Sequence, residues 1–189
     1  AGLMIDEMVV IGSRGRPRTI IDSAVPIDNI NAADLQSTGQ RSIEQMINFR
    51  VPSYNSTNQT ISDATAHFDP SELRNLGPSR TLVLINGKRK NQSAQVYVNE
   101  TPGRSEVGVD MKSIPPAAIE RIEILRDGAS AQYGSDAIAG VINFVLKDAS
   151  EGGSVQVQAG EHFEGESSIK FAANAGMGIG DTGFVNASI

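Results

Sequence analysis

The sequence contains no cysteine, no tryptophan and only two histidines among its 189 residues. Without cysteine the chain has neither disulfides nor thiolate chemistry. The two histidines, His67 and His162, are too few for a multi-histidine metal site. No apolar run approaches the roughly 20 residues that a transmembrane helix needs. The net charge of −6 excludes the basic surface of a typical nucleic-acid-binding protein.

Catalytic motifs are also lacking. There is no GxSxG sequence, and neither Ser130 nor Ser135 has an identifiable base beside it. Residues 178–183 fit GxGxxG, but no helix is expected after them, so they are interpreted as a turn. Glu120 and Glu123 are close to arginines, which favours ion pairing over acid–base chemistry. We therefore predict no catalytic residues, no cofactor and no metal site.

The most informative stretch is Ile119–Leu146. Its first part alternates isoleucines with Glu and Arg, as in a strand with one covered face and one ionic face. Three glycines punctuate the middle, which predicts a turn. Its last part, GVINFVL, is apolar almost throughout and predicts a strand buried on both faces.

Two blocks of this sequence resemble the plug domain of TonB-dependent outer-membrane receptors. The segment LRDGASAQYGSDAIAGVINFVLK resembles the end of the plug, and LRNLGPSRTLVLINGKR resembles its middle. Asn75 departs from the pattern, because the family usually has glycine there. The positions that match the terminal pattern are Glu120, Arg121, Glu123, Arg126, Tyr133, Gly134, Gly140 and Asn143. The resemblance also implies that Arg121 and Arg126 make ionic contacts between plug and barrel.

The N-terminal residues pair an acidic and apolar segment, IDEMVVI, with a tether rich in Gly and Arg, GSRGRPR. By themselves they favour a short edge strand of the domain. The resemblance implies instead a TonB box, which a periplasmic energising protein of the TonB type captures by strand addition. We expect residues 1–18 to be mobile in the free protein. The predicted box comprises Asp6, Glu7, Met8, Val9, Val10 and Ile11.

The middle of the chain predicts alternating short strands and helices. A strand is expected at 25–30, followed by one helix capped by Asn31 and another capped by Ser42. Apolar residues at helical spacing, Ile43, Met46 and Ile47, are expected in the core. Residues 81–85 predict a buried strand that ends at an Asn-Gly turn, and a short helix is expected from Pro116.

Residues 51–69 and 88–108 are long, polar segments with little helix or strand signal. Loops of this length are usually functional or disordered. The resemblance implies apical plug loops that contact the transported solute. The polar and aromatic residues proposed to bind it are Tyr54, Asn55, Asn58, Gln59, His67, Phe68, Asn91, Gln92 and Gln95.

After residue 148 the pattern changes to period-two alternation. Apolar residues alternate with polar ones around 154–159, 168–175 and 185–189, joined by connections at 161–166 and 176–183. Strands of outer-membrane barrels show this pattern, although each segment alone is a weak signal. The resemblance implies the first three strands of such a barrel, whereas a soluble three-stranded meander is the alternative.

Together these observations predict an α+β fold: a small mixed sheet with short helices, then about three antiparallel strands from the start of a transmembrane β-barrel. The expected parts are a box and linker (1–19), a plug (20–148) and truncated barrel strands (149–189). The N-terminus lacks the regions of a signal peptide, so we expect any such peptide to have been removed. We also expect the chain to be a fragment of a longer receptor.

The implied function is TonB-energised uptake of a large, scarce solute across the bacterial outer membrane, with the plug facing the periplasm within the barrel. The solute remains open among siderophore, cobalamin, haem and oligosaccharide. Expected partners are the TonB-type protein, the solute and outer-membrane lipid, but not nucleic acid. The competing hypotheses are a soluble β-rich binding or adhesion module and a hydrolase that uses His67.

Overall fold

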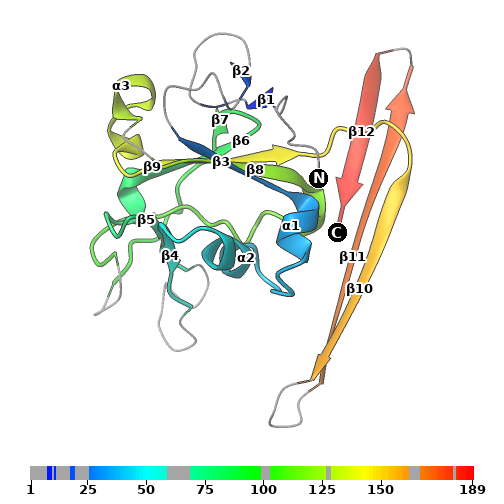
Figure 1. The fold of residues 1–189 in the computed structure, drawn as a ribbon, viewed down its shortest axis with the longest axis horizontal. Coiled ribbons are helices and arrows are strands. Elements are labelled where there is room, and N and C mark those ends of the chain that lie inside the picture. The colour runs from blue at the N-terminus through cyan, green and yellow to red at the C-terminus, as the bar shows by residue number, and fades with distance from the viewer. Residues whose placement is uncertain are drawn as a thin grey trace. The chain divides into compact units, whose positions relative to one another are not determined.

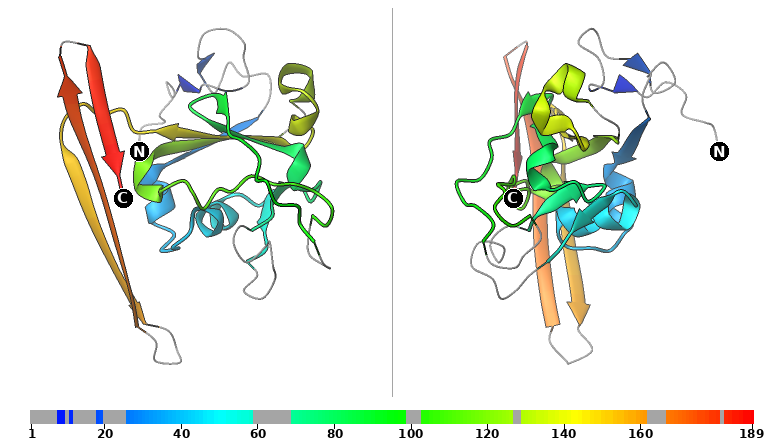
Figure 2. Two further views of the ribbon diagram at one scale, coloured as in Figure 1. Left: turned by 180° about the vertical axis from the view of Figure 1, so that it is seen from behind. Right: turned by 90° about the vertical axis from the view of Figure 1, so that its left-hand side faces the viewer.

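The computed structural model describes residues 8–9, 11, 18–19, 26–58, 69–98, 103–126, 129–161, 167–180 and 182–189. The chain divides into two compact units (Figures 1 and 2). Unit 1 comprises residues 1–113 and 120–145, and unit 2 comprises residues 114–119 and 146–189. Within the described ranges, no helix has the length and apolar character needed to cross a membrane.

A five-stranded mixed sheet forms the centre of unit 1. Its strand order is β3 (Ile27–Asn31), β8 (Ile119–Leu125), β9 (Gly140–Leu146), β6 (Thr81–Ile85) and β7 (Lys88–Arg89). Strand β3 is antiparallel to β8, and β6 is parallel to β9 but antiparallel to β7. The β6–β7 turn uses Asn86 and Gly87 with φ of 49° and 75°, which confirms the predicted Asn-Gly turn.

Both faces of this sheet are covered. The views in Figures 1 and 2 place helices α1 (Ala32–Gln36) and α2 (Ile43–Arg50) on one side and strands β1 (Met8–Val9) and β2 (Arg18–Thr19) on the other. Strand β9 has five fully buried residues at its start, so the prediction of a strand covered on both faces is confirmed. The mixed sheet with few short helices confirms the predicted fold class of this part of the chain.

The two helices begin where the sequence predicted. The Asn31 side chain accepts a hydrogen bond from the Asp34 N–H at 2.8 Å, and the Ser42 hydroxyl accepts one from the Gln45 N–H at 3.3 Å. These caps satisfy backbone donors that have no partner within the helix. The predicted core face of α2 is also confirmed, since Ile43, Met46 and Ile47 are buried.

Several short elements were not predicted. Strand β4 (Tyr54–Ser56) pairs with β5 (Ser71–Leu73). This pair was not predicted, because the two strands are distant in sequence and β4 lies in a polar segment without a local strand signal. Between β8 and β9 lie α3 (Ser130–Tyr133) and the 3₁₀ turn η4 (Ser135–Ala137). A second 3₁₀ turn is η2 (Pro78–Arg80). The helix expected from Pro116 is only the 3₁₀ turn η3 (Pro116–Ala118), since the chain enters β8 directly afterwards.

Unit 2 contains an antiparallel sheet of β10 (Gly153–Glu161), β11 (Ser167–Ile179) and β12 (Gly183–Ser188). Its register pairs Val157 with Phe171 and Met177 with Val185, so the predicted alternation is confirmed. The predicted connection at 176–183 was wrong in extent, because β11 continues to Ile179. A Cβ at Gly176 would lie 2.0 Å from the Ala149 carbonyl oxygen, so this strand position requires glycine.

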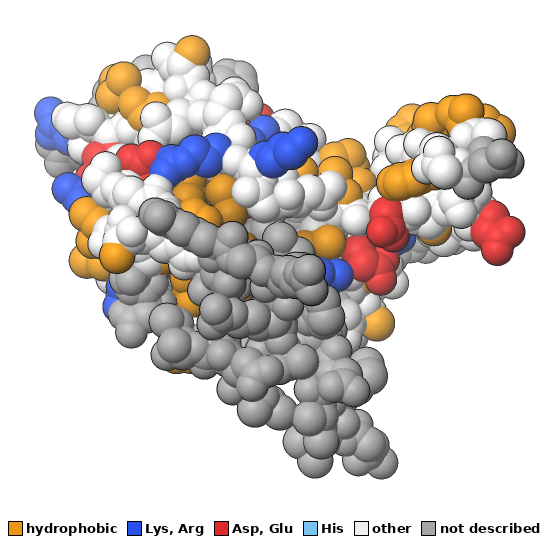
Figure 3. Space-filling model, turned by 90° about the horizontal axis from the view of Figure 1, so that it is seen from above, with side chains coloured by type: hydrophobic (Ala, Val, Ile, Leu, Met, Phe, Trp, Pro, Cys, Tyr) orange, Lys and Arg blue, Asp and Glu red, His pale blue; other side chains and the backbone are white. Residues whose placement is uncertain are grey.

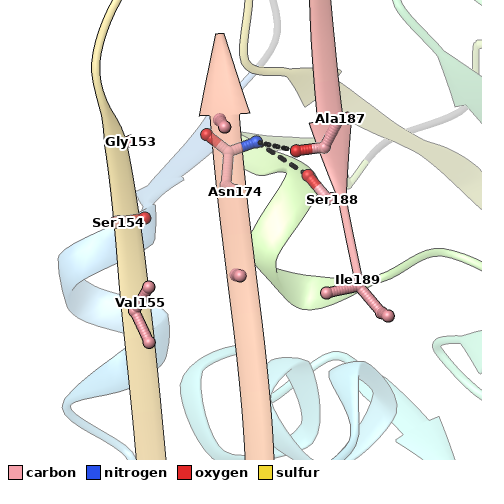
Figure 4. A pocket seen from close by; sticks show the side chains of 9 residues that line it. Gly153, Ser154, Val155, Asn174, Ala187, Ser188 and Ile189 are labelled. Atoms are coloured by element: carbon pink, nitrogen blue, oxygen red, sulfur yellow. Dashed lines mark hydrogen bonds between the residues drawn. The ribbon is translucent and has the colours of Figure 1, made fainter.

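The apolar residues of this sheet remain exposed. Figure 3 shows hydrophobic side chains on the surface, and the exposed fraction reaches 79% at Ile169. On the polar side Asn174 is buried and its amide donates to the Ala187 carbonyl oxygen at 3.2 Å and the Ser188 hydroxyl at 2.7 Å (Figure 4). The sheet therefore combines internal polar pairing with an uncovered apolar face.

Candidate functional site

The predicted box lies where the N-terminal segment meets unit 1. Strand β1 (Met8–Val9) pairs antiparallel with β2 (Arg18–Thr19) in a separate two-stranded sheet. Ile11 is only 2% exposed and packs in an apolar cluster with residues of β6, β8 and β9. Strand β1 is not an edge strand of the main sheet, and the mobility expected for residues 1–18 in the free protein stays a prediction. Asp6, Glu7 and Val10 lie outside the described residues.

A buried carboxylate receives the backbone of Ile11. The Ile11 N–H donates to Glu123 Oε2 at 3.3 Å, and Asn143 Nδ2 donates to the same oxygen at 3.1 Å. The other oxygen, Oε1, lies 3.0 Å from Arg121 Nη2 and also accepts from its Nε at 3.1 Å. Glu123 and Asn143 are fully buried. Charge-assisted hydrogen bonds of this kind are what keep a buried carboxylate tolerable.

The prediction of a simple ionic face on β8 was therefore wrong at Glu123. The residue is buried because the N-terminal segment and Asn143 cover it, and neither contact is visible locally in the sequence. One signal was available: Asn143 is the single polar residue in the apolar run GVINFVL. A polar side chain in such a strand needs a hydrogen-bonding partner, and a neighbouring strand is where that partner is found.

Tyr54 differs from the other residues proposed to bind solute, because it is buried at 3% exposure. Its hydroxyl lies 2.8 Å from the Ser71 hydroxyl and donates to it across the β4–β5 pair. Burial raises the pKa of the Tyr54 phenol, despite the opposing hydrogen bond with Ser71. Tyr54 is thus a buried residue of the β4–β5 pair.

The remaining described candidates are exposed side chains. Asn55 donates from Nδ2 to Asn75 Oδ1 at 3.1 Å, which links β4 to the turn after β5. The candidates that the structure shows at the surface are Asn55, Asn58, Asn91, Gln92 and Gln95. Gln59, His67 and Phe68 lie outside the described residues.

Buried polar side chains connect the segments 51–69 and 88–108. The Tyr97 side chain is fully buried and its hydroxyl donates to the Asp69 carbonyl oxygen at 3.4 Å. The Asp69 carboxylate in turn pairs with Lys112 Nζ at 3.1 Å. Burial raises the pKa of Glu44 and of Tyr97, which favours their neutral forms. In the described ranges no three His, Cys, Asp or Glu side chains are grouped to hold a metal ion.

Glu106, near the end of the segment 88–108, is bonded to η2. Its Oε2 accepts from both the N–H and the hydroxyl of Ser79, at 3.1 and 2.9 Å, and its Oε1 lies 2.7 Å from Arg80 Nη1. Burial alone raises the pKa of this carboxyl, but the Ser79 and Arg80 interactions outweigh it and hold the pKa below its usual value. The loop end is therefore held by a charged clamp.

The two arginines proposed for barrel contacts already have partners within the sheet. Arg126 Nε lies 2.8 Å from Asp28 Oδ2, which joins the end of β8 to β3. Arg121 pairs with the buried Glu123. The Arg126 side chain is 42% exposed and the Arg121 side chain is 23% exposed.

This arrangement of sheet, turn and buried polar centre has a counterpart among known proteins. A family model described as the TonB-dependent receptor plug domain matches residues 19–141. The chain belongs to this family. The match covers β3, β6, β7 and β8 and reaches the start of β9, which runs from Gly140 to Leu146.

Relatives of the plug are found among outer-membrane receptors. The iron-regulated outer membrane virulence protein of Vibrio cholerae is 32% identical over 154 residues, which is 81% of this chain and 22% of that protein. The ferrienterobactin receptor of Escherichia coli is 36% identical over 103 residues, 53% of this chain and 13% of that protein. The chain thus spans less than a quarter of the length of either relative.

Solved structures show the same fold. A ferric enterobactin receptor from Pseudomonas aeruginosa aligns with a TM-score of 0.67 at 23% identity, covering 87% of this chain and 24% of that one. The siderophore receptor PirA from Acinetobacter baumannii aligns with a TM-score of 0.58 at 28% identity, covering 82% of this chain and 22% of that one.

Asn75 stands where the plug pattern usually has glycine. Its φ is 54°, a backbone conformation that asparagine tolerates better than most residues.

Proposed function

We propose that this chain is the plug and barrel start of a receptor that takes up a large, scarce solute across the bacterial outer membrane. The observation that carries the proposal is the match of the plug family over residues 19–141. The named receptor relatives support it over a soluble binding or adhesion module. In this proposal the plug lies inside the barrel and faces the periplasm. The chain itself supplies binding and gating, not catalysis.

A ferric siderophore is the solute class that we propose first. Relatives named as receptors for ferric enterobactin support this choice, although one relative is named a vitamin B12 transporter. The exposed amides of Asn55, Asn58, Asn91, Gln92 and Gln95 supply donors and acceptors for a large polar ligand. Gln59, His67 and Phe68 belong to the same proposed surface.

The proposed division of labour follows the sequence. Residues 1–19 form the box and linker, residues 20–148 the plug, and residues 149–189 the first barrel strands. The uncovered apolar face of β10–β12 supports contact with lipid, since alternating strands place one face outward in such barrels. The partly exposed side chains of Arg121 and Arg126 would meet carboxylates of the barrel wall.

The energising step is proposed to act on residues 6–11. A TonB-type protein would capture this segment by pairing its backbone as an added strand. Uptake of iron-radiolabelled siderophore tests this in receptor-deficient cells that express the full-length receptor. Deleting residues 6–11, or removing the energising protein, should abolish uptake while leaving surface binding intact. Undiminished uptake after both changes would refute the proposal.

The proposed solute surface is tested separately. Replacing residues 55–68 or 91–106 with Gly/Ser sequence should abolish siderophore binding to whole cells. A matched control replaces the exposed Gln156 and the half-buried Lys170 of unit 2 with Ser, which leaves both loops unchanged. Normal binding by both loop variants would remove these loops from recognition.

A further inference from the structure

A row of polar residues crosses one face of the main sheet in unit 1. Asn29 of β3 stands opposite Glu123 of β8 in the strand register, and Glu123 bonds to Asn143 of β9. The surrounding residues of this face are apolar: Leu82, Leu84, Leu125 and Val141 belong to one buried cluster. Burying polar side chains within an apolar cluster costs free energy unless they form hydrogen bonds. The partners of these hydrogen bonds therefore indicate what the row binds.

The row contacts the N-terminal segment. Ile11 inserts its side chain into the same apolar cluster and donates its N–H to Glu123 Oε2 at 3.3 Å. The segment is thus held by an apolar anchor and by a charge-assisted backbone hydrogen bond at one residue. These two contacts are separate in kind, and both are lost when Ile11 leaves the sheet.

Another residue of the row, Asn29, has hydrogen-bonding groups that this contact does not use. Both polar side-chain atoms of Asn29, Nδ2 and Oδ1, are buried and have no hydrogen-bond partner among the residues that the structure describes. A carboxamide offers a donor and an acceptor side by side, which is the complement of a peptide group in an extended chain. Asn29 is therefore suited to receive the backbone of a segment that shifts along the row.

The far end of the row reaches the β6–β7 turn. Asn143 Nδ2 donates to Glu123, which fixes the orientation of the amide and directs its Oδ1 toward Gly87. The Gly87 N–H donates to that oxygen at 2.9 Å. Gly87 has a φ of 75° and precedes the strand that leads into residues 91–95. One continuous set of hydrogen bonds thus connects Ile11 to the start of a proposed solute loop.

We propose that Asn29, Glu123 and Asn143 form a seat for the N-terminal segment, and that Glu123 positions this segment and couples its release to the Asn86-Gly87 turn. Withdrawal of Ile11 removes one donor from a buried carboxylate, so Glu123 and Asn143 must reorganise and Gly87 loses its fixed acceptor. The role in uptake rests on the proposed function, because it assumes that the energising partner pulls on residues 6–11.

Amide hydrogen exchange on the full 189-residue chain, without solute or partner, tests the coupling. A variant lacking residues 1–11 is compared with one lacking residues 1–5, which retains Ile11. The first should accelerate exchange at Gly87 about tenfold, as expected for the loss of a hydrogen bond in a charged network. Exchange at Ile122 in the centre of β8 should remain slow in both variants. The second variant should match the intact chain.

A second pair of variants separates the carboxylate from the packing. Glu123→Gln retains an acceptor for the Ile11 N–H and should keep most of the Gly87 protection, whereas Glu123→Ala should lose it. If Glu123→Ala does not fold, the comparison of Ile11→Ala with Leu82→Ala replaces it, since both truncate the same cluster and the backbone of Ile11 is hydrogen-bonded to Glu123. Only the Ile11 variant should expose Gly87 selectively.

Two results would overturn the proposal. Unchanged exchange at Gly87 after removal of residues 1–11 would show that the segment and the turn are independent. Equal acceleration at Gly87 and Ile122 would show general destabilisation instead of coupling. Neither measurement involves transport, so failure of the seat is distinguishable from failure of the proposed uptake function.

Discussion

The two sheets of this protein use similar residues in opposite ways. In the mixed sheet of unit 1, Val141, Ile142 and Phe144 are fully buried, whereas Val157 and Phe171 in unit 2 are 65% and 58% exposed. Burial of apolar area is the main favourable term in folding, so unit 1 has its own core. The three-stranded sheet has no such core and displays an apolar face that suits lipid or further strands.

The largest difference in stability is expected when a phenylalanine is replaced by alanine in each of the two sheets. Phe144→Ala should destabilise unit 1 by about 3–5 kcal/mol, because it removes a fully buried ring and leaves a cavity. Phe171→Ala should change stability by no more than about 0.5 kcal/mol. Urea denaturation followed by circular dichroism measures both. Equal effects would mean that the two sheets share one core, contrary to this comparison.

A second comparison is between two glycines, one in each unit. Gly140, at the start of β9, has a φ of 145°, and an added Cβ would lie 2.3 Å from the Leu125 carbonyl oxygen. Gly140→Ala should therefore cost about 2–5 kcal/mol, from backbone strain and overpacking together. Gly152, before β10, has a φ of 83° and no atom within 4 Å of an added Cβ, so Gly152→Ala should cost only about 1 kcal/mol. Thermal melting would contradict this if the order were reversed.

The Glu106 clamp predicts a smaller, pH-dependent effect within unit 1. Glu106→Gln should lower stability by about 1 kcal/mol at neutral pH, since it removes the ion pair with Arg80 and weakens acceptance from Ser79. The folded-state pKa of Glu106 lies below the ordinary value of 4.5, so its contribution is present above that pH and is lost as pH falls through the folded pKa.

Denaturation at several pH values checks this expectation. The difference between Glu106→Gln and the intact chain should shrink on acidification. Asp136→Asn is a suitable control, because it removes an exposed ion pair with Arg89, for which a stability change below about 1 kcal/mol is expected. A difference at Glu106 that grew on acidification would contradict the clamp.

The smallest effect on unit 1 should come from removing unit 2 strands. A chain ending at Asp148 retains the buried strands β6, β8 and β9 and should melt cooperatively within a few degrees of the full chain. Light scattering should show less self-association, because unpaired strand edges and an exposed apolar face promote it. Failure of the shortened chain to fold, together with a strictly monomeric full chain, would favour a single soluble domain.

Much of this fold was predictable from local patterns. The strands at 81–85, 119–125 and 140–146 follow from β-branched composition and turn glycines, and both helix caps follow from single side chains. The alternation of unit 2 is visible because successive strand residues point to opposite faces. Each of these signals depends on the backbone geometry of a few consecutive residues.

The buried polar residues depended on contacts between distant parts of the sequence. Glu123 and Arg121 look like a solvent-facing pair in sequence, yet Ile11, 112 residues earlier, covers Glu123 and makes it a buried acceptor. Tyr54 lies in a polar segment and becomes a core residue only through pairing of β4 with β5. Burial depends on what the fold places above a side chain, and a charge changes role when water is replaced by protein donors. Sequence alone therefore determined the main strands, the two capped helices and the family, while tertiary structure decided the short pairings and which polar residues are buried.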